Sequence, residues 1–431
     1  MIELLLGLLQ QSNQPSQPTW HDDIYHIMLT HCSECHDGKG AGPFELLTYE
    51  SVANRATFIE ALIEEKLMPP WLPSKEGAPL QGERCMSDEQ IALFKQWVKG
   101  GKLKGEGAQI VVCPVEMETP VMTKRTESDY AWIIPAESGI RWHEGVLDKR
   151  TFVLPIENET LLKVNRIQYS TTAPQAVQMV GFVFDGSGQG KRVDAWDREP
   201  GYEMMGDIGW IPSGSHGKIG PGAGGVFVPP GFYLEIPANA DLVAETHYRP
   251  RGKQEQLSST VQLWETTDES ARQLLPLITM IRRIVLEPEA TNVIEGESIQ
   301  IPYAVDLIGV TPRAGSECES MRLAATLPDG KEMVLIDIPR WDPHYGETVF
   351  FDKPIRLPAD SIISSQWIYN NSESNPRNPF VPAKKVDLAR RTGIANFILH
   401  SAAVDAQQET AIIAWNQGLL RKRQRATNKS N

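Results

Sequence analysis

The sequence contains little cysteine and little histidine, with five cysteines and nine histidines in 431 residues. So few cysteines exclude a small scaffold held together by many disulfides. No apolar run reaches the roughly 20 residues that a membrane-spanning helix needs, so no transmembrane span is predicted. An excess of basic residues is missing too, because the formal net charge is -13, and nucleic acid is therefore not a predicted partner.

Two of the five cysteines stand in Cys32-Ser33-Glu34-Cys35-His36. This is the attachment pattern of a c-type haem, in which both thiols bond to the vinyl groups and the histidine ligates the iron. A chance occurrence and a zinc site that also uses His31 are the competing interpretations. Structural zinc needs four nitrogen or sulfur ligands, and neither Cys85 nor Cys113 belongs to a second close pair. The pattern therefore favours haem c.

A methionine suited to the other face of the haem follows in Lys66-Leu67-Met68-Pro69-Pro70-Trp71. Iron held by histidine and methionine is an electron-transfer centre with a raised potential. Residues 48–67 predict a helix, because apolar residues recur there every three or four positions. The paired prolines end this helix and stiffen the loop that follows. Met68 is therefore the predicted second axial ligand of the iron, in preference to a core-filling role, and Met86 is the reserve.

The length predicts two or three domains rather than one core. Helices are predicted at residues 19–30, at 48–67 and after the capping box Ser87-Asp88-Glu89-Gln90. Three helices around one covalent haem would form a small all-α domain of residues 20–105.

The residue pattern of the sequence changes after residue 105, because helical periodicity is lost there. Short runs rich in β-branched and aromatic residues alternate with Pro, Gly and Asp clusters, as in β-sandwiches. The clearest predicted strands are residues 163–170, 176–184, 242–248 and 259–265. The clearest hairpin spans residues 321–338 and turns at Pro328-Asp329-Gly330. The remaining chain is divided into linker and edge structure at 106–150, sandwiches at 151–272 and 273–405, and a basic tail at 406–431. Residues 410–420 of this tail could form a short helix, and the basic residues after it are predicted to be a disordered end.

Residues 1–19 are predicted to be a leader or the remnant of a signal. The apolar start resembles the hydrophobic part of a secretion signal, but it lacks a positive n-region and a cleavage site. Export to the periplasm or beyond is predicted from the haem alone, because c-type haem is attached outside the bacterial cytoplasm. In an oxidising compartment Cys85 and Cys113 could pair as a disulfide, and Cys318 is read as a small buried hydrophobe.

Motifs in the first 90 residues resemble the cytochrome c domain that some bacteria, planctomycetes among them, fuse to a copper monooxygenase module. The motifs that carry this resemblance are Cys32 to His36, Gly42-Pro43-Phe44, Leu47-Thr48-Tyr49-Glu50, Met68-Pro69-Pro70-Trp71 and Ser87-Asp88-Glu89.

The rest of the chain resembles the module itself, the copper type II, ascorbate-dependent family of peptidylglycine α-hydroxylating and dopamine β-monooxygenases. The residues that carry this second resemblance are Phe152-Val153-Leu154-Pro155, Gly209-Trp210-Ile211-Pro212, His247-Tyr248, Ala325-Thr326-Leu327-Pro328-Asp329-Gly330, Ile338-Pro339-Arg340-Trp341-Asp342, Tyr369-Asn370-Asn371-Ser372 and Asn375-Pro376-Arg377-Asn378-Pro379. The two resemblances together cover residues 20 to about 399. They imply two tandem antiparallel β-sandwiches of jelly-roll type, each with one copper site in the active enzymes.

Most of the copper ligands that the resemblance implies are missing. The family holds one copper by two adjacent histidines and a third one, but the matching strand here reads Val177-Gln178-Met179-Val180. The second copper uses a His-x-His and a methionine, where this chain has Arg313-Ala314-Gly315 and Thr392-Gly393-Ile394-Ala395. His247 alone falls on a family-like strand motif, and Arg313 puts a cation where a metal would sit. Copper is therefore a doubtful cofactor.

Two interpretations of His247 remain open. It could be a relic ligand that joins Met179 and His216 in a weak, rearranged copper site. The interpretation we prefer is a strand histidine that is hydrogen-bonded at the interface of the sandwiches.

The sequence thus predicts an exported mono-haem cytochrome that exchanges single electrons with an unidentified redox partner protein. Its sandwiches would be an inactive monooxygenase scaffold that serves as a docking or binding platform. The competing hypothesis is an active copper monooxygenase that hydroxylates a C–H bond with electrons from the haem in place of ascorbate. A third hypothesis, a binding module with a structural metal instead of haem, predicts a colourless protein.

Overall fold

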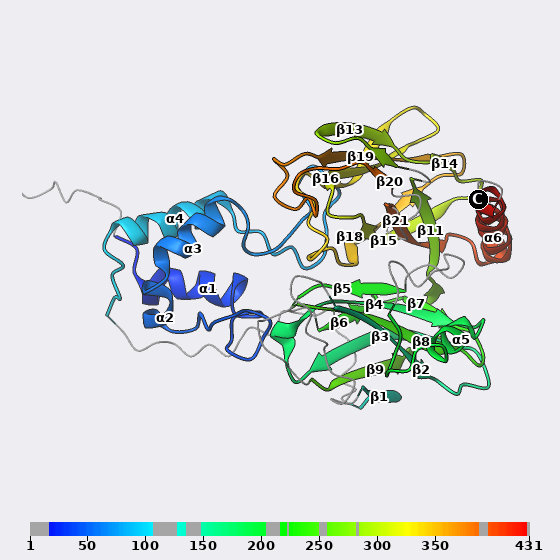
Figure 1. The fold of residues 1–431 in the computed structure, drawn as a ribbon, viewed down its shortest axis with the longest axis horizontal. Helices are drawn as coiled ribbons and strands as arrows, with labels where there is room; N and C mark the ends of the chain where they lie inside the picture. The colour runs from blue at the N-terminus through cyan, green and yellow to red at the C-terminus, as the bar shows by residue number, and fades with distance from the viewer. Residues whose placement is uncertain are drawn as a thin grey trace, which may run out of the picture. The chain divides into compact units, whose positions relative to one another are not determined.

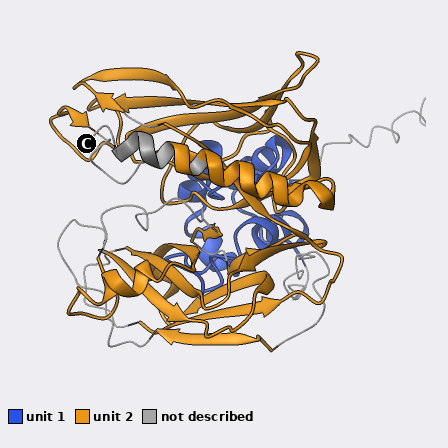
Figure 2. Ribbon diagram, turned by 90° about the vertical axis from the view of Figure 1, so that its right-hand side faces the viewer, with its two compact units in different colours: residues 1–71, 84–118 blue, residues 72–83, 119–431 orange. Residues whose placement is uncertain are grey.

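The computed structural model describes residues 17–106, 127–134, 148–203, 216–221, 224–249, 257–281, 284–387 and 395–428. The chain divides into two compact units (Figure 2). Among the described residues, unit 1 holds 17–71 and 84–106, and unit 2 holds 72–83 together with everything from residue 127 onward. Most of the regular structure is β, which confirms the prediction of a β-rich chain. In the described part, no helix combines the length and the apolar character that crossing a membrane requires.

The described part of unit 1 contains helices only (Figure 1): the π-helical turn η1(Trp20–Ile24), α1(Tyr25–His31), α2(Tyr49–Ala53), α3(Ala56–Glu64) and α4(Asp88–Lys99). Thr19 caps the first of them through its side chain, and Ser87 forms the predicted capping box with Gln90 at the start of α4. The single helix predicted at 48–67 is two helices, because Arg55 leaves the helical conformation between them.

Aromatic side chains fill the core of unit 1. Trp20 and Trp97 are fully buried and their rings lie 6.3 Å apart, with Tyr25 and Phe94 packed against them. Burying side chains of this size contributes roughly 1.5–3 kcal/mol each. Met86, the reserve axial ligand, is 8% exposed and belongs to this core.

The segment Leu72–Glu83 belongs to unit 2, so the predicted continuous domain of residues 20–105 is wrong in this stretch. Its backbone amides donate to the carbonyl oxygens of Asp337, Leu335 and Phe350, at 2.7, 3.2 and 2.8 Å. These hydrogen bonds add the segment to the edge of strands that lie more than 250 positions later in the sequence, which no local pattern could reveal.

In the described residues, the first β module of unit 2 has ten strands. These are β1(Tyr130–Ile134), β2(Asp148–Pro155), β3(Leu162–Thr171), β4(Val177–Asp185), β5(Gly217–Ile219), β6(Gly225–Phe227), β7(Phe232–Ile236), β8(Asp241–Tyr248), β9(Ser259–Glu265) and β10(Arg272–Gln273), with the helix α5(Gln189–Asp194) after β4. One sheet has the order β1-β9-β3-β7-β10, with β6 on β3, and the other has the order β2-β8-β4-β5.

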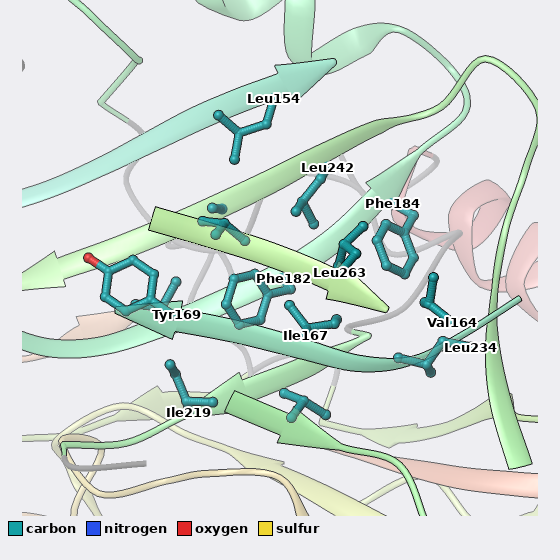
Figure 3. Close-up of a cluster of buried hydrophobic side chains, with 14 of the residues drawn as sticks. Leu154, Val164, Ile167, Tyr169, Phe182, Phe184, Ile219, Leu234, Leu242 and Leu263 are labelled. Atoms are coloured by element: carbon teal, nitrogen blue, oxygen red, sulfur yellow. The ribbon is translucent and has the colours of Figure 1, made fainter. Parts of the chain in front are cut away.

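Both sheets of the first β module contribute to one hydrophobic core (Figure 3). Ile167 and Leu263 come from the first sheet and Phe182 and Leu242 from the second, and all four are fully buried. The four clearest predicted strands correspond to β3, β4, β8 and β9, each within one residue. Within the predicted linker and edge structure, β1 stands at one end of the strand order of its sheet among the described residues, and β2 begins at Asp148.

The second β module follows at Leu275, close to the predicted boundary between residues 272 and 273. Its strands are β11(Leu275–Met280), β12(Val285–Leu286), β13(Ala290–Glu295), β14(Ile299–Gln300), β15(Val305–Arg313), β16(Cys318–Thr326), β17(Glu332–Ile338), β18(Val349–Leu357), β19(Ile362–Asn371), β20(Val386–Asp387) and β21(Asn396–Ala403). The sheet orders are β13-β19-β16-β17 with β14 on β19, β11-β21-β15-β18, and the pair β12-β20. The predicted hairpin is β16–β17, with Met321 opposite Ile338. Among the described ladders, only β10–β7 is parallel.

The short helix predicted at residues 410–420 is part of the longer helix α6(Ala406–Asn428), so the predicted disordered end is wrong (Figure 1). Ile412 on this helix is buried, and the Asn416 side chain donates to the carbonyl of Pro276 at 2.6 Å. The helix is therefore anchored to the second β module by a buried apolar residue and a buried amide.

Candidate functional site

The cysteine pair follows directly on the end of α1. Cys32 is the C-cap of this helix, and the amide of His36 donates to the carbonyl of Cys32 at 3.0 Å. This hydrogen bond closes a turn that holds both cysteines and the histidine in one short loop. The Cys32 sulfur also lies 3.8 Å from the sulfur of Met28, against the core of unit 1.

The imidazole of His36 is oriented by a backbone carbonyl. Its Nδ1 lies 2.8 Å from the carbonyl oxygen of Phe44. A carbonyl oxygen only accepts, so Nδ1 carries the proton and Nε2 keeps a lone pair for a metal. Histidines that ligate metals usually donate their second ring nitrogen in this way. Sequence reasoning missed Phe44 as a supporting residue, since only its membership in a motif was visible.

Two glycines let the loop after His36 approach this turn. A Cβ atom at Gly42 would lie 2.6 Å from Nδ1 of His36, and one at Gly40 would lie 2.6 Å from the carbonyl oxygen of Cys35. Both contacts are closer than side chains tolerate. The residues after the histidine therefore hold its ring against the Phe44 carbonyl.

We expect Gly42→Ala to reduce incorporation of haem severalfold, because the added methyl would push the His36 ring off its carbonyl partner. Haem per chain, measured on purified protein from matched cultures, checks this expectation. Lys39→Ala, at an exposed position of the same loop, is the control and should match wild type. An unchanged haem content in the Gly42 variant would contradict the orientation assigned to His36.

The thiol of Cys32 is protonated at neutral pH. Burial and the neighbouring Cys35 raise the pKa of this thiol to about 12. A structural zinc site needs thiolates, whereas the two thiols of a haem-binding pair become neutral thioethers. Among the described residues, no group of three or more His, Cys, Asp or Glu is placed to hold a metal ion. Cys32 is thus a neutral thiol before any group is attached to it.

Met68 lies in the loop that ends α3. Its amide donates to the carbonyl of Leu62 at 3.3 Å, so the loop begins as a continuation of the helix end. Farther on, the Trp71 ring lies 5.3 Å from the guanidinium of Arg84, whose carbonyl oxygen pairs with Nδ1 of His31. Arg84 thus links the Met68 loop to the helix end that precedes Cys32. The role of Met68 on the iron remains a prediction.

The second region of interest is the outer face of the sheet β2-β8-β4-β5. Lys149, His247 and Met179 are aligned across its first three strands. Two residues before His247 on β8, Glu245 is aligned with Gly181 of β4, and Gly181 is aligned with Lys218 of β5. Residues two apart on a strand share a face. This face therefore carries polar side chains, of which those of Lys218, Glu245 and His247 are almost completely buried.

The Glu245–His247 pair satisfies the imidazole without a metal. Nε2 of His247 lies 2.6 Å from Oε1 of Glu245. Burial lowers the pKa of His247 against the opposing effect of Glu245. Burial would raise the pKa of Glu245, but His247, Arg313 and Lys149 hold it below its usual range. A neutral imidazole therefore donates to an ionised carboxylate, the arrangement expected of the hydrogen-bonded interpretation.

A β-bulge marks the strand that aligns with the adjacent histidines of the family. The register of β4 against β8 shifts between Val177 and Met179, so Gln178 is the extra residue. Gln178 is buried, and its side-chain oxygen has no hydrogen-bond partner in the described part of the chain. At the two positions that align with the adjacent histidines of the family, this chain thus has the amide of Gln178 and the thioether of Met179.

The proposed grouping of His216 with His247 is wrong. The amide of His216 donates to the carbonyl of Phe182, and its ring nitrogen accepts from the amide of Phe184. This places it about four residues, or roughly 13 Å, along the sheet from the row of His247. His216 instead lies close enough to the buried His400 for that residue to help lower the pKa of His216, and His400 bonds to Thr311 at 2.9 Å.

Other residues of the copper interpretation are dispersed. His344 pairs with Asp342 at 3.0 Å, and Arg313 ends β15. The motifs at 209–212 and 392–394, together with Cys113 and His143, lie outside the described residues, as does the predicted leader up to residue 16. The disulfide between Cys85 and Cys113 therefore stays a prediction.

Unit 2 should lose stability in acid. Burial lowers the pKa of His216 to about 3 and that of His400 to about 4, from 6.5. Below about pH 6 the unfolded chain takes up protons that the folded chain refuses, so stability falls as pH falls. Each histidine contributes up to about 1.4 kcal/mol per pH unit between its two pKa values.

Urea unfolding at pH 7 and pH 5 measures this loss for the wild type and for His400→Gln. On acidification the variant should lose less stability than the wild type, and the difference should equal the contribution of one histidine. An equal loss in both proteins would contradict the assignment to His400.

Comparisons with known proteins leave the family open. No family model matches the chain, and no curated protein matches it. Among solved structures, the STIV MCP covers 65% of this chain and 99% of its own, with 13% identity and a TM-score of 0.24. A structure of infectious bursal disease virus Gt strain covers 71% and 90%, with 12% identity and a TM-score of 0.16. The CBM22-1-CBM22-2 tandem domain of Paenibacillus barcinonensis Xyn10C covers 66% and 100%, with 8% identity and a TM-score of 0.15. These scores are too low to indicate a common fold.

Proposed function

We propose that this protein is an exported mono-haem c-type cytochrome that transfers single electrons. Unit 1 would be its cytochrome c domain, with Cys32 and Cys35 as thioether anchors and His36 and Met68 as axial ligands. The observation that carries the proposal is the hydrogen bond from Nδ1 of His36 to the Phe44 carbonyl. It fixes the tautomer and leaves Nε2 available for iron.

Different residues of unit 1 would hold different parts of the haem. When bound, haem supplies one-electron chemistry between Fe(III) and Fe(II). The turn from Cys32 to His36 presents both thiols and the imidazole from one loop, and the Phe44 carbonyl keeps the ring in place. Prolines after Met68 restrict the loop that would carry the thioether. A restricted ligand loop limits rearrangement between the two oxidation states.

The two β modules would be tandem jelly-roll-like sandwiches of the copper monooxygenase type that serve as a docking or binding platform. His247 is satisfied by Glu245, and an amide and a thioether occupy the bulge where the family has two histidines. Lys218 adds a buried amine nearby, and burial, with Arg313 next in effect, lowers its pKa to about 7. Such a face suits a fixed hydrogen-bond network better than a copper ion.

The competing copper monooxygenase has support from the same bulge, because Met179 and His247 are directly opposite each other. Copper content and copper EPR of the purified protein discriminate the two functions. Our proposal expects copper well below one ion per chain after dialysis against a trace of copper. Near-stoichiometric copper with a protein-ligated EPR signal would overturn the inactive platform.

Expression with and without a c-type maturation system tests the electron-transfer function. With maturation, the purified chain should be red and should take up one electron per molecule in a reductive titration. A protein that is equally colourless in both cultures would overturn the cytochrome and favour a structural metal. Fractionation of the expressing cells tests export, which should place the red protein outside the cytoplasm.

A further inference from the structure

A cavity of about 480 Å³ opens on the first β module, away from the residues considered so far. It lies against β2 and the segment that follows α5, and its lining includes Arg150, Trp196, Asp197, Tyr202 and Glu203. Its volume falls within the range of roughly 300–1,000 Å³ that small-molecule sites occupy. No function derived above uses this cavity.

The polar part of the cavity is rigidly built. Arg150 is 8% exposed, and its guanidinium donates to the carbonyls of Pro200 and Gly201, both at 2.9 Å. It also donates to Asp197 at 3.3 Å, and the same carboxylate accepts the backbone amide of Glu203 at 3.3 Å. The arginine and the aspartate are thus held in fixed positions before any ligand arrives.

Tyr202 is the most deeply buried residue named at this cavity. The side chain is 1% exposed, and its oxygen has no hydrogen-bond partner within the described part of the chain. Burial, together with the carboxylates of Glu245, Asp185 and Asp194, raises the pKa of this phenol far above its usual value. The hydroxyl therefore keeps its proton. A buried donor without an acceptor is costly and is uncommon in folded proteins.

Trp196 provides a flat apolar surface at the same cavity. Its side chain is 81% exposed, more than any other large hydrophobic residue in the described part. Tryptophan is usually highly buried on average, and an exposed large ring beside a cavity marks a contact surface for a ligand.

The charges around the cavity nearly balance. Arg150 and Arg198 face the three carboxylates of Asp197, Glu199 and Glu203. A strongly charged ligand would gain little from such a set. A ligand with many hydroxyl groups both donates and accepts hydrogen bonds, and so it can use the arginines and the carboxylates together.

We propose that this cavity binds a neutral carbohydrate, with the C–H face of a pyranose ring stacked on Trp196. Its hydroxyl groups pair with the fixed Asp197 carboxylate and with Glu203. The proposal requires only the first β module to be folded, and it holds whether or not unit 1 carries a haem.

Calorimetric titration of the full-length protein with cello-, xylo-, manno-, malto- and chitotetraose tests the proposal. At least one of these sugars should bind with a dissociation constant below about 1 mM. Trp196→Ala should weaken that binding at least about tenfold, a loss typical of removing a central aromatic contact. Ile133→Ala, which truncates another exposed apolar side chain of the same module, should leave it unchanged.

Failure of all five sugars, or equal binding by the Trp196 and Ile133 variants, would overturn the proposal. Tetramethylammonium chloride is titrated in parallel. Its binding through Trp196 without any sugar binding would identify a cation site and equally overturn it.

Discussion

Replacing both Cys32 and Cys35 with alanine should abolish covalent attachment of haem completely. The two thioether bonds would be the only covalent links between the porphyrin and the chain, so none would survive denaturation of the variant. After expression with a maturation system, a denaturing gel stained for haem should show a strong band for the wild type and none for the double variant.

Cys85→Ala is the matched control for this experiment, because it removes a thiol of the same unit outside the turn. The control should retain the full haem stain. Haem stain that persists in the double variant, or that disappears in the Cys85 variant, would show that the turn at Cys32 to His36 is not the attachment site.

Replacing Met68 with alanine should remove the weak band near the red end of the oxidised spectrum that a methionine-to-iron bond produces. It should also lower the reduction potential, because a thioether ligand stabilises the reduced iron. Optical spectra of the oxidised protein and a potentiometric titration measure both effects. The haem itself should remain attached, since Cys32 and Cys35 are untouched.

Met86→Ala separates a ligand from a core residue. Met86 is packed in the core of unit 1, so its truncation should cost about 2–5 kcal/mol of stability and leave the band in place. If the band instead disappears with Met86 and persists with Met68, the axial ligand is misassigned.

Local patterns predicted local structure well in this chain. Short runs rich in β-branched and aromatic residues located β3, β4, β8 and β9, and the capping box at Ser87 located α4. These signals work because strand burial and helix capping depend on residues within a few positions of each other.

Features that depend on distant partners could not be predicted. Leu72–Glu83 joins the edge of the second β module through backbone hydrogen bonds that leave no trace in side-chain pattern. Only residues 410–420 of α6 were predicted as a helix. Its packing depends on the burial of Ile412 and on the hydrogen bond from Asn416 to Pro276, which lies 140 positions earlier in the chain.

In the candidate site, too, the local features were predictable and the features that depend on other parts of the chain were not. The spacing of Cys32, Cys35 and His36 is a local signal and was readable directly. The carbonyl of Phe44 that orients His36 is a backbone group, which any residue could supply. Likewise, no periodicity shows that Glu245 would satisfy His247.

The central claim is that one porphyrin is covalently attached to the turn that ends in His36. The pyridine haemochrome spectrum of the full-length protein, purified after expression with a c-type maturation system, tests it most directly. The account predicts the spectrum of a haem with two saturated vinyl groups, at one haem per chain, which acidified solvent does not extract. A colourless protein, or a haem that the solvent removes, would contradict the account.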